Sequence, residues 1–67
     1  MYIIKEMGKE KYLCVVEKDI ASISIPLEGM EGNNETYLPT KFNTINEAKE
    51  IIKGLVKNIT WQIVYAD

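Results

Sequence analysis

The sequence contains no histidine and no arginine, and it has one cysteine among 67 residues. Histidine most often moves protons near neutral pH and is the commonest metal ligand, so its absence removes most enzyme templates and argues against a zinc site. Cys14 cannot form an internal disulfide, whereas small domains in oxidising compartments usually contain several. We therefore expect a non-catalytic protein with no metal and no cofactor, located in a reducing cytoplasm.

Basic charge is also scarce. The chain has eight lysines against ten acidic residues, and its net charge is −2. Non-specific nucleic-acid binding depends on clustered basic residues, and without arginine the bidentate fork that recognises guanine or phosphate is missing. Composition therefore disfavours direct nucleic-acid binding.

Long apolar runs are missing from the first 25 residues. Every stretch is interrupted by a charged side chain, the interrupting residues being Lys5, Glu6, Lys9, Glu10 and Lys11. A signal peptide needs an uninterrupted apolar segment, and a membrane span needs a longer one. We therefore expect neither a signal peptide nor a membrane partner.

What remains is typical of one small folded domain, residues 1–67, with 46% hydrophobic residues. Residues 2–7 and 12–16 are β-branched and aromatic runs separated by Gly8, which predicts a β-hairpin. Residues 21–25 and 59–66 alternate with period two, which predicts two further strands. Trp61 is expected to anchor the core from the last strand.

A helix is predicted over residues 44–57. Thr44 and Glu47 have the spacing of a capping box, in which the hydroxyl accepts from the Glu47 amide and the carboxylate reaches back. Apolar residues then recur every three or four positions, with Gly54 inside the helix. They are Ile45, Ala48, Ile51, Ile52, Leu55 and Val56.

These elements predict an α+β fold in the order β-β-β-loop-α-β. A small, mainly antiparallel sheet of three or four strands would be covered on one face by the helix. One helix cannot cover both faces, and we expect a second, partly apolar face with Tyr2, Ile4 and one side of residues 12–16. An exposed apolar face usually marks an interface, so a homodimer is a further expectation.

Residues 26–36 show no periodicity and are expected to form a loop, either a mobile linker or a binding surface. In the second interpretation the loop and Tyr37 contact a protein partner. Apolar and aromatic anchors carry most interface energy, and like charges steer a partner of opposite sign. The expected anchors are Leu27, Met30 and Tyr37, and the expected steering charges are Glu28, Glu31 and Glu35.

A second surface keeps another hypothesis open. Lys49, Lys53 and Lys57 are four residues apart, so a helix through them would align them in one ridge. Such a ridge would serve a nucleic-acid-binding accessory protein, or it would be an ordinary solvated face. Salt-dependent binding to oligonucleotides would favour the nucleic-acid interpretation over the protein-binding one.

Four segments carry a resemblance to known proteins, and they are Tyr2-Ile3-Ile4-Lys5, Lys11-Tyr12-Leu13, residues 41–49 and Ile63-Val64. Tyrosine-rich strands, a Phe-x-Thr-x-x-Glu-Ala-Lys helix start and a final strand resemble small proteins of phages and mobile elements of low-GC bacteria. Some of these proteins are anti-CRISPR-type inhibitors. The resemblance implies a protein that binds and inhibits a host defence complex in the cytoplasm of a bacterial host.

Overall fold

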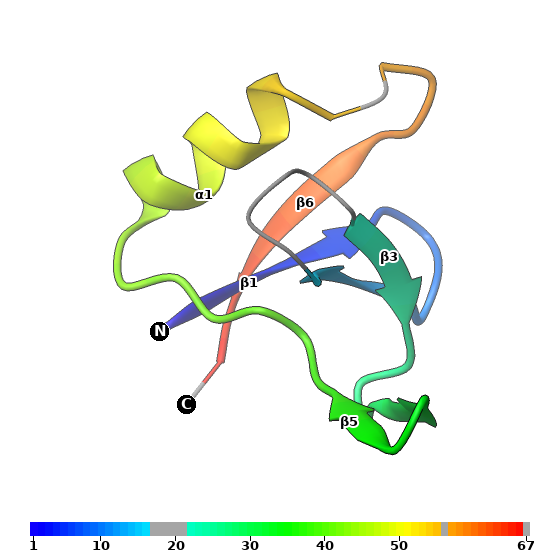
Figure 1. The fold of residues 1–67 in the computed structure, drawn as a ribbon. Helices are drawn as coiled ribbons and strands as arrows, with labels where there is room; N and C mark the ends of the chain where they lie inside the picture. Colours follow the sequence, from blue (N-terminus) through cyan, green and yellow to red (C-terminus); the bar gives the residue numbers. More distant parts are fainter. Residues whose placement is uncertain (17–21, 56, 67) are drawn as a thin grey trace.

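The computed structural model describes residues 1–16, 22–55 and 57–66. Within them the chain forms six strands and one helix (Figure 1). The elements are β1 (Tyr2–Glu6), β2 (Tyr12–Val15), β3 (Ser22–Ile25), β4 (Met30–Gly32), β5 (Glu35–Tyr37), α1 (Ile45–Lys53) and β6 (Trp61–Tyr65). The predicted α+β class is therefore confirmed.

Four strands form one antiparallel sheet in the order β3-β2-β1-β6. The predicted hairpin is present, and it turns at Gly8, whose φ of 82° is a conformation that glycine adopts without strain. The chain's last strand, β6, pairs with its first, so it encloses β1 between two neighbours. The predicted three- to four-stranded antiparallel sheet is thus confirmed at four strands.

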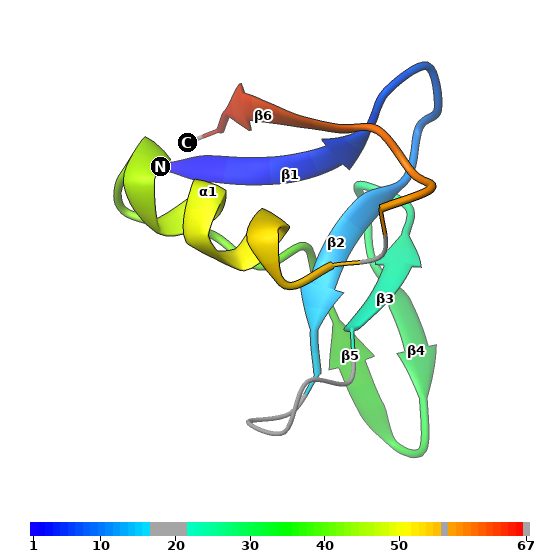
Figure 2. The same cartoon turned by 90° about the horizontal axis from the view of Figure 1, so that it is seen from above.

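The sheet opens between β1 and β2. Lys5 opposite Tyr12 is their only register pair, and β2–β3 turns away from β1–β6 (Figure 2). Residues 40–42 occupy the opening, where Phe42 and Tyr2 exchange two backbone hydrogen bonds of 2.8 Å. On the other side, the Thr40 amide donates to the Leu13 carbonyl at 3.0 Å. Backbone groups of β1 and β2 that are too far apart to bond each other are thereby hydrogen-bonded to residues 40–42.

Helix α1 begins as predicted but ends sooner. The Thr44 hydroxyl accepts from the Glu47 amide at 3.2 Å, while the Glu47 carboxylate accepts from the Asn43 amide rather than from that of Thr44. The prediction of a helix to residue 57 was wrong, since α1 ends at Lys53 and Gly54 is its C-cap. Glycine is a poor helix former, and the Gly54 and Leu55 amides bond carbonyls three residues back, which tightens the last turn. Val56 lies outside the described residues.

The core lies between the sheet and α1. Ile4, Leu13, Phe42 and Ala48 form its buried centre. Half-buried residues pack around this centre, and they are Val15, Ile51, Ile52, Leu55, Trp61 and Ile63. The expected role of Trp61 is confirmed, whereas Ile45 is 42% exposed and belongs to the surface.

The sheet face expected to mediate a homodimer needs correction. Ile4 is 0% exposed and packs in the core with Ala48 of α1, so it lies on the covered face. The neighbouring Tyr2 packs its ring edge-on against Tyr65, with centroids 5.5 Å apart. On the opposite face, Tyr12 and Cys14 are also buried. These residues therefore do not form the open apolar face on which the dimer expectation rested.

The prediction of an unpatterned loop over residues 26–36 was also wrong. Here β4 and β5 form a separate two-stranded antiparallel hairpin. Asn33 and Asn34 connect the strands with φ values of 53° and 63°. Two consecutive positive φ values define a type I′ turn, whose twist matches that of a hairpin and which asparagine tolerates. The two asparagines were the hairpin signal in a segment that lacks apolar alternation.

Among the described residues, no helix has the length and apolar character needed to cross a membrane.

Candidate functional site: the acidic hairpin

The β4–β5 hairpin brings the predicted site residues into a defined register. Met30 lies opposite Tyr37 and Gly32 opposite Glu35, while Glu31 lies opposite Thr36. Side chains alternate between the faces of a strand, so Met30, Tyr37 and Glu35 share one face. Glu31 and Thr36 lie on the other face.

Two glycines allow the hairpin to pack on itself. At Gly29, where φ is 90°, an added Cβ would lie 2.5 Å from the Tyr37 carbonyl oxygen and 2.7 Å from Cδ2 of Leu38. At Gly32 it would lie 3.6 Å from Cε2 of Tyr37, so the tyrosine ring lies beside this glycine. Tyr37 is therefore half-buried within the hairpin and is not a freely exposed anchor.

The apolar surface next to the hairpin is larger than the sequence indicated. Leu27 and Met30, two predicted anchors, are 56% and 43% exposed. Leu38, which sequence reasoning missed, is 57% exposed. Its position between β5 and Pro39, outside any alternating pattern, was the available signal. A hollow of about 220 Å³ brings Leu27 and Leu38 together, and it is lined by Ile3, Leu27, Leu38, Pro39, Lys41 and Ala66.

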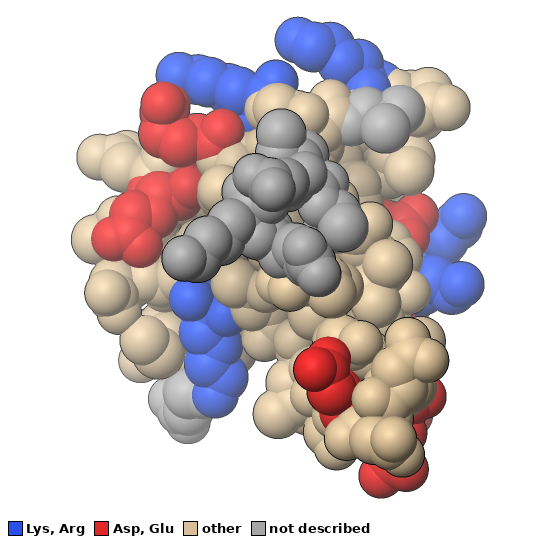
Figure 3. Space-filling model, viewed as in Figure 1, with Lys and Arg blue, Asp and Glu red and all other residues tan. Residues whose placement is uncertain are grey.

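Charge distinguishes the hairpin from the rest of the chain. Residues 26–37 contain Glu28, Glu31 and Glu35 and no basic residue, so they carry −3. Because the whole chain carries −2, the remaining residues carry +1. All three glutamates are exposed, and Figure 3 shows acidic side chains on this projecting part of the molecule. The predicted steering charges thus lie in one segment, with Glu31 and Glu35 on β4 and β5 and Glu28 in the turn just before β4.

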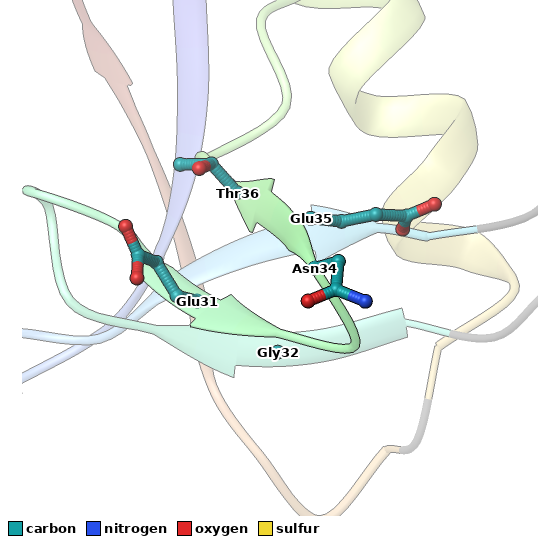
Figure 4. A pocket seen from close by; sticks show the side chains of 5 residues that line it. All are labelled: Glu31, Gly32, Asn34, Glu35 and Thr36. Atoms are coloured by element: carbon teal, nitrogen blue, oxygen red, sulfur yellow. The ribbon is translucent and has the colours of Figure 1, made fainter.

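The glutamates do not converge on a shared point. A polar hollow of about 390 Å³ is lined by Glu31, Gly32, Asn34, Glu35 and Thr36, whose positions are labelled in Figure 4. The side chains of Glu31 and Glu35 extend to different sides of the hairpin in this view. In the described part of the chain, no three side chains of metal-binding type form a group. The glutamates therefore form a spread negative surface and not a convergent group of ligands.

The lysine ridge is shorter than predicted. Lys49 and Lys53 lie on α1, but Lys57 follows the end of the helix and is not part of a helical ridge. Lys53 also forms a 2.7 Å ion pair with Glu50 on the same helix. Of the three lysines in the alternative nucleic-acid surface, Lys57 therefore lies outside the helix and Lys53 is paired with a carboxylate.

Titratable side chains in the sheet have local partners. Glu6 is 8% exposed and lies 3.9 Å from the Lys9 ammonium. Burial raises the pKa of Tyr12, and so do the 3.1 Å hydrogen bond that it donates to Glu10 and the negative charge of Glu10. Cys14 is a free cysteine buried on β2, where it packs as a small apolar residue does.

Comparisons with known protein families, curated proteins and solved structures found no match to this chain.

Proposed function

We propose that this protein is a non-catalytic binding module that presents the β4–β5 hairpin and its flanking leucines to a basic surface of a protein partner. The observation that carries the proposal is the concentration of three exposed glutamates and three exposed apolar side chains in residues 27–38. Interfaces commonly combine apolar anchors with charges that steer association. Leu27, Met30 and Leu38 are the anchors in this proposal.

The placement of the hairpin supports this role. Its strands belong to their own sheet, whereas α1 packs on β1 and β6. None of the three exposed apolar residues belongs to the core cluster. A surface that the core does not use is free to vary for a partner.

A more specific proposal follows from the resemblance to phage and mobile-element proteins. The partner is then a host defence complex whose nucleic-acid-binding surface is basic, and the acidic hairpin competes with nucleic acid for it. Support comes from the sign of the hairpin charge. Salt should weaken such binding mainly through the association rate.

The test is quantitative capture of partners from a bacterial lysate by matched variants. One variant carries Glu28→Lys, Glu31→Lys and Glu35→Lys, a second carries Leu27→Ala and Leu38→Ala, and the control carries Lys49→Glu on α1. We expect proteins bound by the parent to be lost from both hairpin variants and kept by the control. Equal capture by folded hairpin variants would place the binding surface elsewhere.

The nucleic-acid alternative has a separate test. Binding of a labelled oligonucleotide by the parent and by the Lys49→Glu variant is measured over a range of salt concentrations. Binding that weakens with salt and with this substitution would favour the lysine surface. We expect no measurable binding, because Lys53 is paired with Glu50 and Lys57 lies beyond the helix.

A further inference from the structure

The outer edge of β6 has features that the proposed function does not use. β6 is the terminal strand of the four-stranded sheet, and Figure 2 shows it along one border of the molecule with no described element beyond it. Its sequence, Trp61-Gln62-Ile63-Val64-Tyr65, contains no charge, proline or glycine. Natural edge strands usually carry such residues because they block pairing with other chains.

The register with β1 shows which backbone groups face outward. The Met7 amide donates to the Thr60 carbonyl and the Ala66 amide to that of Met1. Hydrogen-bonded and non-hydrogen-bonded pairs alternate along an antiparallel ladder, so Gln62 and Val64 point their backbone groups at β1. The amides and carbonyls of Trp61, Ile63 and Tyr65 therefore point away from it, and no described residue bonds to them.

This outward pattern is symmetric about Ile63. An antiparallel second copy of β6 would place Ile63 opposite its counterpart and Trp61 opposite Tyr65, and every outward amide would meet an outward carbonyl. Side chains of the three residues share one face, so Trp61 and Tyr65 would form an aromatic cross-strand pair at each end. On the other face Gln62 would lie opposite Val64, which brings no like charges together.

We propose that two copies of this chain pair through β6 into a continuous eight-stranded antiparallel sheet. The side-chain pairing argues for a second copy over an unrelated peptide, because β6 opposite itself pairs its own aromatic residues at both ends of the strand. Tyr65 is 68% exposed, so this edge has an aromatic side chain that pairing would cover. A two-fold interface of this kind is closed and does not propagate into filaments.

The test combines molecular mass with amide hydrogen exchange in the full chain. With increasing protein concentration up to about 1 mM, we expect the mass to rise from 7.7 kDa to twice that value. In the same series, the amides of Trp61, Ile63 and Tyr65 should change from rapid to slow exchange. The amides of Gln62 and Val64 should be slow throughout. A mass that stays at one chain, or a dimer whose outward amides stay rapid, would overturn the proposal.

A pair of variants gives an independent measure. Tyr65→Pro removes an outward amide without removing a bond to β1, and it should abolish the dimer. Tyr65→Ala keeps that amide and loses only the aromatic pair, which should weaken the dimer by about two- to fivefold. A folded Tyr65→Pro variant that dimerises as strongly as the parent would contradict pairing through this edge.

Discussion

The four-stranded sheet with its helix and the β4–β5 hairpin are held together in different ways. The sheet and α1 enclose side chains such as Ile4 and Leu13, which are 0% and 1% exposed. Within the hairpin strands no residue is buried, and the turn at Asn33–Asn34 and the close contact at Gly29 define the shape. Burial thus specifies the framework, which is the four-stranded sheet with α1, whereas backbone conformation specifies the shape of the hairpin.

The largest expected effect separates the two regions directly. Leu13→Ala should cost about 2 to 5 kcal/mol, because it leaves a cavity in the core. A chain of this size has only a few kcal/mol of stability, so this variant should be mostly unfolded. The matched Met30→Ala change on the exposed hairpin should cost less than about 0.5 kcal/mol. Denaturant unfolding followed by circular dichroism measures the stability of both variants. Equal losses would contradict the difference between the sheet core and the hairpin.

A second prediction compares two glycines with positive φ. Gly8→Ala should lower the free energy of unfolding by about 1 to 2 kcal/mol, because alanine is strained in the left-handed conformation. No clash adds to this cost, since no atom of the described residues, apart from its chain neighbours, lies within 4 Å of the added Cβ. Gly29→Ala adds a clash with the Tyr37 carbonyl oxygen. We expect it to displace the hairpin while the sheet stays folded, since the two are separate.

Amide spectra would show this as shifts confined to residues 26–40. Loss of the β1–β6 signals in the Gly29→Ala variant would mean that the hairpin supports the sheet.

A smaller effect is expected at the start of α1. Thr44→Ala removes the hydroxyl that accepts from the Glu47 amide and should cost about 1 kcal/mol. Thr44→Ser keeps the hydroxyl and should stay near the parent. The free energy of unfolding checks both, and an unchanged value for Thr44→Ala would show that the cap does not stabilise this helix.

The smallest effect concerns alkaline pH. The pKa of Tyr12 is raised in the folded chain, so its contribution to stability is complete below the unfolded pKa of about 10. It is lost as pH rises through the folded pKa. The parent's unfolding free energy should therefore fall more steeply above pH 10 than that of Tyr12→Phe. Parallel pH profiles for the two proteins would exclude this contribution.

Sequence patterns predicted the four-stranded sheet and α1 well, because apolar residues that are buried on one face of a strand or helix recur at regular spacing along the chain. The alternation in residues 59–66 and the Thr44 cap located β6 and the beginning of α1. The end of α1 was missed because the apolar spacing continues past Gly54, where the backbone tightens. Ile4 was assigned to the wrong face because alternation alone does not say which face the helix covers.

The hairpin was harder to predict because its strands contain no fully buried residue and show no apolar alternation. Its charges and two of its anchors could be selected from composition alone, namely Leu27 and Met30. Leu38 was not selected, because it lies outside the unpatterned segment and only the structure shows that it is exposed beside Leu27.

The separation of framework and hairpin is the central claim, and amide hydrogen exchange of the monomeric chain at low concentration tests it most directly. We predict that the amides that pair β4 with β5 exchange at least about tenfold faster than those that pair β1 with β6, through local opening. A mildly destabilising change such as Ile63→Val should speed exchange in the sheet and leave the hairpin rates unchanged. Equal rates in both regions, accelerated together by this change, would contradict the account.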